Sequence, residues 1–183
     1  MKKITFFLTT AISLSAANCL AADKYNYTPY VGLDYTYSHA KAHGFSPTHH
    51  AGGLHIGSMY SPYFGTEIFF NQSGGDSRRL ADGKIKTSYR AYGLDIAAYL
   101  PLDCAQKFSL LATTGIGEYV YKQKITPQKH HNDHGYGYRF GGGVKLALTQ
   151  NWQARFITRY VKLDHISGYN HTLENSFSVE YHF

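Results

Sequence analysis

The feature that most constrains this chain is an alternation of apolar with polar or small residues that recurs in eight segments of about ten residues each. Side chains of a β-strand point alternately to its two faces, so each segment predicts a strand with one apolar face. In the first segment Leu33 and Tyr35 fall on one face, whereas Asp34 and Thr36 fall on the other. One residue represents the predicted apolar face of each segment in turn: Leu33, Ile56, Ile68, Leu94, Leu110, Leu146, Phe156 and Val179.

The connections between the segments alternate between short and long, as in transmembrane barrels. An even number of strands can close into a barrel that leaves no unpaired strand edge in lipid. No apolar window of about 18 residues that would form a membrane helix follows the N-terminal region. The prediction is an all-β fold, an eight-stranded antiparallel up-and-down transmembrane β-barrel. Tight turns are predicted near residues 61–64, 101–107 and 149–151, and longer polar outer loops near 41–51, 74–84, 123–135 and 165–173.

Aromatic residues gather near the segment ends, where a membrane barrel has its interfacial girdles. A soluble barrel of lipocalin type is the competing interpretation, because its alternating strands turn their apolar faces inward. The many aromatics on the apolar faces and the charges on the opposite faces favour the membrane barrel. The predicted girdle residues are Tyr30, Tyr60, Phe64, Trp152, Tyr160 and Phe183.

Residues 1–22 are predicted to be a cleavable signal peptide and residues 23–183 a single barrel domain. Two lysines precede a short apolar run that ends in small residues, which is the pattern of a secretory signal. Cleavage after Ala21 or Ala22 would leave about 161 residues, exported through the periplasm.

The two cysteines indicate a fold without an internal disulfide bond. Cys19 allows the alternative of lipoprotein processing, which cuts before a cysteine, but Asn18 is a poor residue at that boundary. After either cleavage at the alanines, Cys104 is left without a second cysteine.

The predicted mature chain is mildly basic. Removing Lys2 and Lys3 leaves 16 basic and 12 acidic residues, a net charge of +4. Nucleic acid is not expected as a partner of an exported chain, whereas anionic lipopolysaccharide or acidic polysaccharide would respond to this charge.

Four acidic and four basic residues lie at the alternate strand positions that are predicted to face away from lipid. An eight-stranded barrel is just wide enough for its side chains to fill, and an isolated buried charge costs several kcal/mol, so these groups are expected to pair. A salt-bridged core that holds the barrel rigid is favoured over a gated small-ion pore. The predicted lumen network consists of Asp34, Glu67, Asp95, Arg139, Lys145, Arg155, Arg159 and Glu180.

Nine of the eleven histidines fall at the predicted outer loops or rims. Three interpretations stay open: a hydrated loop surface, capture of a metal such as zinc or copper, and a charge gain below about pH 6.5 that favours acidic glycans. No spacing matches a defined metal site, and no cofactor is predicted. The predicted outer-loop patch consists of His43, His49, His50, Lys124, Lys129, His130, His131, His134, His165 and His171.

Three stretches carry a resemblance to a known family: YLPL at residues 99–102 through GIG at 115–117, YRFGGGV at 138–144, and NSFSVEYHF at 175–183. In these patterns of glycine and aromatics the chain resembles the OmpA-like or opacity-type outer-membrane β-barrel family over most of its length. The resemblance implies a Gram-negative outer membrane, with surrounding lipid and lipopolysaccharide. It also implies that Phe183 belongs to the signal read by the barrel-assembly machinery. No peptidoglycan-binding domain is expected after the barrel.

An enzymatic alternative comes from lipid A deacylases, which use His, Ser and an acid at the outer rim of a barrel. The His-x-Ser spacing of His165 and Ser167 is similar to theirs, with Glu174 or Glu180 as the acid. Neither acid falls clearly at that family's spacing, so no catalytic residue is predicted.

The sequence therefore indicates a non-enzymatic, monomeric surface protein. Its barrel would anchor four outer loops that contact host glycans or proteins, lipopolysaccharide or other envelope components, because loops on a rigid scaffold often carry function. A lipid A esterase and a metal-capturing surface protein are the alternatives.

Overall fold

The computed structural model describes residues 27–42, 47–80, 83–126, 130–166 and 169–183. The predicted signal peptide, residues 1–22, lies outside them. All regular elements of the described residues are β-strands, and no helix there is long and apolar enough to span a bilayer. The strands are β1 (Thr28–Ala42), β2 (Thr48–Ser61), β3 (Phe64–Ser73), β4 (Asp76–Leu80), β5 (Gly83–Pro101), β6 (Phe108–Thr126), β7 (His130–Ala147), β8 (Trp152–Asp164) and β9 (Tyr169–His182).

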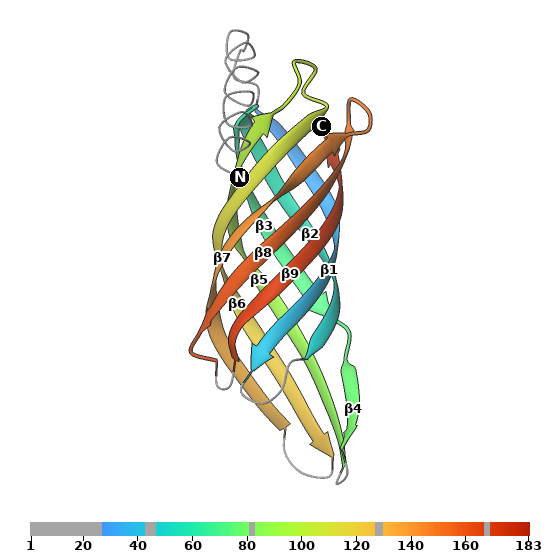
Figure 1. The fold of residues 1–183 in the computed structure, drawn as a ribbon, viewed down its shortest axis with the longest axis vertical. Coiled ribbons are helices and arrows are strands. Elements are labelled where there is room, and N and C mark those ends of the chain that lie inside the picture. The colour runs from blue at the N-terminus through green and yellow to red at the C-terminus, as the bar shows by residue number, and fades with distance from the viewer. Residues whose placement is uncertain (1–26, 43–46, 81–82, 127–129, 167–168) are drawn as a thin grey trace, which may run out of the picture.

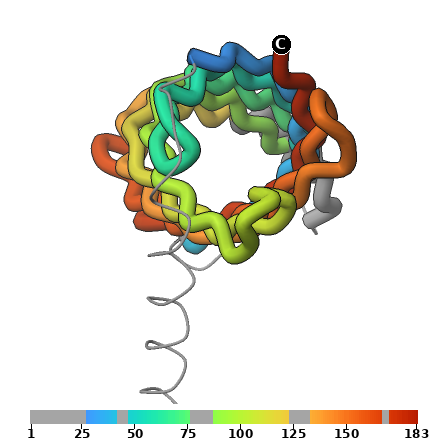
Figure 2. Tube along the Cα trace, turned by 90° about the horizontal axis from the view of Figure 1, so that it is seen from above, coloured from blue at the N-terminus to red at the C-terminus, as the bar shows by residue number. Residues whose placement is uncertain are grey.

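The strands close into one antiparallel barrel, which Figure 2 shows end-on as a complete ring. Strands that follow each other in the chain pair with each other, except β3 and β4, which both pair with β5; β1 pairs with β9 and closes the barrel. Because β3 and β4 both pair with β5 and follow each other across Gly74 and Gly75, they are two parts of one barrel strand. The predicted eight-stranded up-and-down barrel is confirmed.

The outer face of the barrel is apolar, as the alternation predicts. Leu33, Ile68 and Ile56 expose 69%, 65% and 59% of their surface, and no inward core gathers the eight representative residues. Exposure of large aliphatic side chains on this scale would be costly in water, at about 25 cal/mol for each Å² of apolar surface. The face therefore suits contact with lipid tails.

Aromatic side chains flank this apolar band. Tyr60, Phe64 and Trp152 are exposed on the outer face at the ends of β2, β3 and β8 that meet the short turns, and Tyr160 lies toward the other end of β8. The prediction was wrong for Tyr30, which is 1% exposed and points into the lumen, where its hydroxyl donates a hydrogen bond to Glu67 at 3.1 Å. Its even position in β1 already shares the parity of Asp34.

Three short turns join the strands at the end that carries the C-terminus, at residues 62–63, 102–107 and 148–151, as predicted. Asp103 organises the second of them. Its two carboxylate oxygens accept hydrogen bonds from the backbone N–H groups of Lys107 (3.1 Å) and Phe108 (2.8 Å). These bonds favour the ionised form and lower the pKa of Asp103.

The opposite ends of the strands are longer than predicted. Strand pairing continues through most of the predicted loops, and β5 and β6 pair as far as Lys84 and Thr126, at the bottom of Figure 1. The error has a physical reason: beyond the membrane both faces of a hairpin meet water, so its strands no longer need an apolar face. The alternation in sequence disappears there although the hydrogen-bonded ladder continues.

Glycines make room for large side chains in the lumen. Gly32 lies directly opposite His55 in the register, Gly57 opposite Tyr30, and Gly141 opposite Arg159. A Cβ at Gly141 would lie 2.6 Å from Arg159 Cγ, and a Cβ at Gly32 would overlap the His55 ring. Each large side chain therefore lies across a neighbouring strand that has no side chain at that point.

Candidate functional site

The structure places all eight residues of the predicted lumen network inside the barrel. Asp34 is 7% exposed at its side chain, and the other seven residues are 6% exposed or less. Their side chains come from β1, β3, β5, β7, β8 and β9, so the network connects strands that are far apart in the sequence.

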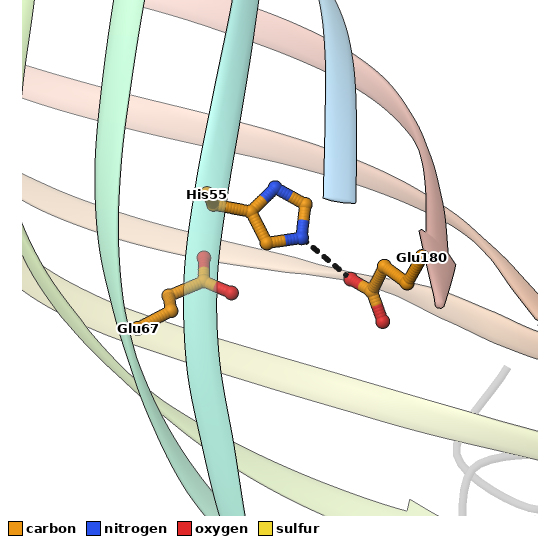
Figure 3. Close-up of side chains that lie close together, drawn as sticks. All are labelled: His55, Glu67 and Glu180. Atoms are coloured by element: carbon orange, nitrogen blue, oxygen red, sulfur yellow. Dashed lines mark hydrogen bonds and ion pairs between the residues drawn. The ribbon is translucent and has the colours of Figure 1, made fainter. Parts of the chain in front are cut away.

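Arg155 lies at the centre of one cluster. Its guanidinium approaches Glu67 at 2.7 Å and Glu180 at 2.8 Å, and Nη2 lies 3.2 Å from His55 Nε2. His55 in turn contacts Asp34 through Nδ1 at 2.7 Å. Its Nε2 lies 3.1 Å from Glu180, as Figure 3 shows. His55 shares the inward parity of the network, but the sequence prediction did not count it as a charge partner.

His55, Glu67 and Glu180 also have the ligand types and spacing of a metal site, because one ligand atom of each lies within 4.8 Å of the others. All three residues, however, already contact the Arg155 guanidinium. A metal ion would have to displace or repel this buried cation. The cluster is therefore better explained as a structural ion-pair network.

The ion pairs continue along the lumen toward the outer end. Arg159 lies 3.4 Å from Glu67 and 3.5 Å from Asp95, and Arg139 lies 3.5 Å from both Asp95 and Glu174. The sequence prediction missed Glu174 as a member of the network, although the residue shares the parity of Glu180 on β9.

An aromatic layer fills the lumen beyond the ion pairs. Tyr89, Tyr119 and Phe69 are buried there with His49, whose ring lies edge-on to Tyr89 at 5.5 Å. Tyr119 joins the two layers, because its hydroxyl donates a hydrogen bond to Glu174 at 3.1 Å. The assignment of His49 to the outer-loop patch was wrong: the residue is 1% exposed, because position 49 has the inward parity of Ala51 and His55.

Planar-bilayer recordings of the unmodified protein are expected to show no large, stable conductance. The physical reason is that fully buried arginine and tyrosine side chains, among them Arg139, Arg155 and Tyr119, fill the lumen in successive layers. Recordings with a steady open level in most insertions would contradict this occlusion.

A row of basic and titratable side chains lies on the outward face near the outer strand ends. Lys41 of β1 is directly opposite His171 of β9, which is directly opposite Lys162 of β8. The two lysines are exposed, and the half-buried His171 ring stacks on Tyr160 with centroids 5.3 Å apart. We call Lys41, His171 and Lys162 the outer basic row.

Other residues of the predicted patch lie on strands rather than in loops. His50 is exposed on β2 and its Nδ1 lies 2.6 Å from the Tyr35 hydroxyl, whereas the exposed His134 on β7 lies 3.4 Å from Glu118. Lys124 of β6 is opposite His130 of β7 in the register, and His131 follows on the same strand. His43 and Lys129 lie outside the described residues.

The structure does not bring the suggested esterase residues together in its described part. His165 is exposed, and its Nδ1 lies 3.4 Å from Asp164. Glu174 and Glu180 instead face the lumen and pair with Arg139 and Arg155. Ser167 lies outside the described residues.

Phe183 lies at the end of the barrel that carries the short turns. It is 72% exposed, and its backbone N–H donates to the carbonyl oxygen of Pro29 at 3.1 Å. Its role as an assembly signal stays a prediction.

Comparison with known proteins agrees with this architecture. The family model of the outer membrane protein beta-barrel domain matches residues 5–183. No curated protein sequence matches the chain.

Several solved outer-membrane proteins share the fold at low sequence identity. Neisserial surface protein A is 14% identical, with a TM-score of 0.67 over 85% of this chain and 97% of its own. Ail of Yersinia pestis, the attachment invasion locus protein, is 16% identical, with a TM-score of 0.62 over 85% of this chain and 98% of its own. A second structure of Ail, in complex with the heparin analogue sucrose octasulfate, has a TM-score of 0.64 at 16% identity over 86% of this chain and 99% of its own.

Proposed function

Because the chain belongs to the outer membrane protein beta-barrel domain family and lies in the bacterial outer membrane, we propose that it is a surface protein whose outer end binds anionic glycans. The glycans in question carry sulfate or phosphate groups, as host glycosaminoglycans and lipopolysaccharide do. The barrel acts as a rigid anchor, and its occluded lumen takes no part in the binding.

The outer basic row carries this proposal. Lys41, His171 and Lys162 are neighbours on three adjacent strands, so their charged ends face the same surface. Opposed residues of antiparallel strands have Cβ atoms about 4.5–5.5 Å apart, a spacing that lets one sulfated or phosphorylated sugar contact two of them. Because the row sits on paired strands, the protein backbone loses little conformational entropy when the glycan binds.

The register of the longest hairpins also brings three basic or titratable residues opposite one another. Lys86 of β5 is opposite Lys124 of β6, and Lys124 is opposite His130 of β7. Basic residues therefore recur at two places around the outer end. The Ail complex with a heparin analogue supports the choice of a sulfated ligand, since that barrel has the same fold.

Lys162→Gln is expected to weaken binding to heparin and to lipopolysaccharide by up to about five-fold, and by at least about 1.4-fold. An exposed ion pair contributes about 0.2–1 kcal/mol, which corresponds to this range. Binding of the wild type should strengthen between about pH 7.5 and 5.5, because imidazole side chains gain charge below about pH 6.5. Surface plasmon resonance on the detergent-solubilised protein, at low and high salt, measures both effects.

Lys107→Gln is the matched control, because it removes one exposed lysine at the opposite end of the barrel. It should leave glycan binding unchanged. Equal losses for Lys162→Gln and Lys107→Gln would rule out the outer basic row as the site. Binding that requires added zinc would instead support metal capture by the outer histidines.

A further inference from the structure

A polar cavity of about 250 Å³ opens at the end of the barrel that carries the short turns. Side chains from six strands and three turns line it, so it occupies the mouth of the lumen rather than a gap in one hairpin. In a barrel whose outer end carries the longer hairpins, this mouth faces the periplasm. The outer basic row plays no part in it.

The cavity contains a buried ammonium group. Lys145 is 6% exposed, and its Nζ lies 4.3 Å from the centre of the Tyr99 ring and 3.7 Å from Met59 Sδ. Among the residues that the structure describes, no carboxylate lies within 4 Å of this Nζ, whereas Arg139, Arg155 and Arg159 each have at least one such partner. Lys145 is therefore the one base of the predicted network that the described carboxylates leave without an ion pair.

A buried ammonium is stable only with compensation. Moving an isolated ammonium out of water costs several kcal/mol, and a ring face and a thioether sulfur return part of this. A small anion in the cavity would supply the missing charge. Lys145 itself lines the cavity, so an anion there would lie beside the ammonium group.

The rest of the lining has the donors that an oxyanion needs. Three glutamine amides and buried or partly buried hydroxyl groups surround the cavity with Lys145, and Asp and Glu are absent from its lining. Gln153 Oε1 is buried without a hydrogen-bond partner, so this amide is not held by a neighbour through that atom. His182 Nε2 already contacts Glu180 Oε2 at 3.2 Å. The lining residues that could contact an anion include Lys145, Gln106, Gln150, Gln153, Ser61 and Ser109.

We propose that the periplasmic mouth of the barrel binds a small oxyanion, either a carboxylate or a phosphate, with Lys145 as its charge partner and the glutamine amides as hydrogen-bond donors. Carboxylates and phosphates share the geometry that an ammonium and amide N–H groups recognise. The cavity volume limits the ligand to a small ion or to the terminal group of a longer molecule.

The structure offers a direct reporter. The chain has two methionines, Met1 and Met59, so in a protein labelled at its methionine methyl groups Met59 is the one probe among the residues that the structure describes. Met59 Sδ lies beside Lys145 Nζ. Titration of the detergent-solubilised full chain with inorganic phosphate, and separately with N-acetylglycine as a terminal carboxylate, is expected to shift the Met59 methyl resonance in a saturable manner with at least one of the two anions. The anion that binds more tightly shows whether the ligand is a phosphate or a carboxylate.

Lys145→Leu should weaken this binding about ten-fold or more, because a charge-assisted hydrogen bond is lost. Lys107→Gln, which removes a neighbouring exposed lysine outside the cavity lining, should change the binding less than about two-fold. If Lys145→Leu does not fold, Gln153→Leu keeps the charge, removes one amide and should weaken binding measurably. No saturable shift with either anion, or equal losses in Lys145→Leu and Lys107→Gln, would overturn the proposal.

Discussion

Replacing Arg155 with methionine is expected to lower the free energy of unfolding by about 3–5 kcal/mol. The change leaves Glu67 and Glu180 buried without the cation that approaches both within 2.8 Å. Removal of one partner from a buried ion pair is strongly destabilising because the other charge stays uncompensated. Urea unfolding in lipid vesicles, followed by the fluorescence of Trp152, the single tryptophan, measures the loss.

Arg90→Met is the matched control. Arg90 is exposed on the outer face of β5, where its Nε donates to Gln72 at 3.0 Å, so its loss should cost less than about 1 kcal/mol. Combining Arg155→Met with Glu67→Gln should recover part of the lost stability, since one unpaired charge is removed with the arginine. If Arg155→Met unfolds at the wild-type urea concentration, the ion-pair network does not stabilise the barrel.

Introducing arginine at Ile96 is expected to destabilise the barrel by about 2–4 kcal/mol, the cost of a charge on the lipid face near the bilayer midplane. Ile96 is 41% exposed on the outer face, and it lies between Tyr92 and Leu100 on β5. Ser88→Arg, on the same face near the outer rim, should cost at most about 1 kcal/mol, because the charge there reaches the headgroups.

The same unfolding assay compares the two variants. A difference of several kcal/mol is expected in lipid vesicles, and it should shrink in a detergent with a thin apolar layer. Equal costs for Ile96→Arg and Ser88→Arg would show that the band around Ile96 does not lie in the hydrocarbon core.

Period-two alternation was sufficient to predict the eight strands across the apolar band and which face most of their residues occupy, but not the outer parts of the strands. It assigned Arg139, Arg155 and Glu67 to one side because parity is a local property of the backbone. It could not identify the partners: Arg155 and Glu67 are 88 residues apart and meet across the lumen. Which side chains face each other there depends on the stagger of the closed barrel, which no single segment encodes.

The misassigned residues share one cause. Tyr30, His49 and Glu174 each have inward parity, yet residue type or the position of a predicted loop outweighed it in the interpretation. A tyrosine near a segment end was assigned to the girdle, and a histidine in a polar stretch to a loop. Parity continues to govern side-chain direction wherever the strand ladder continues, and here the ladder extends past the apolar band.

The glycines that face large lumen residues also bear on how such a barrel changes over evolutionary time. A larger residue at Gly32 or Gly141 requires a smaller one at His55 or Arg159, because each pair shares one space. Two substitutions must then occur together, whereas an outward leucine can become isoleucine or phenylalanine alone, since lipid adapts to its shape. Divergence is therefore expected to accumulate first on the lipid face and to enter the lumen as coupled exchanges, while the fold itself is retained at 14–16% identity.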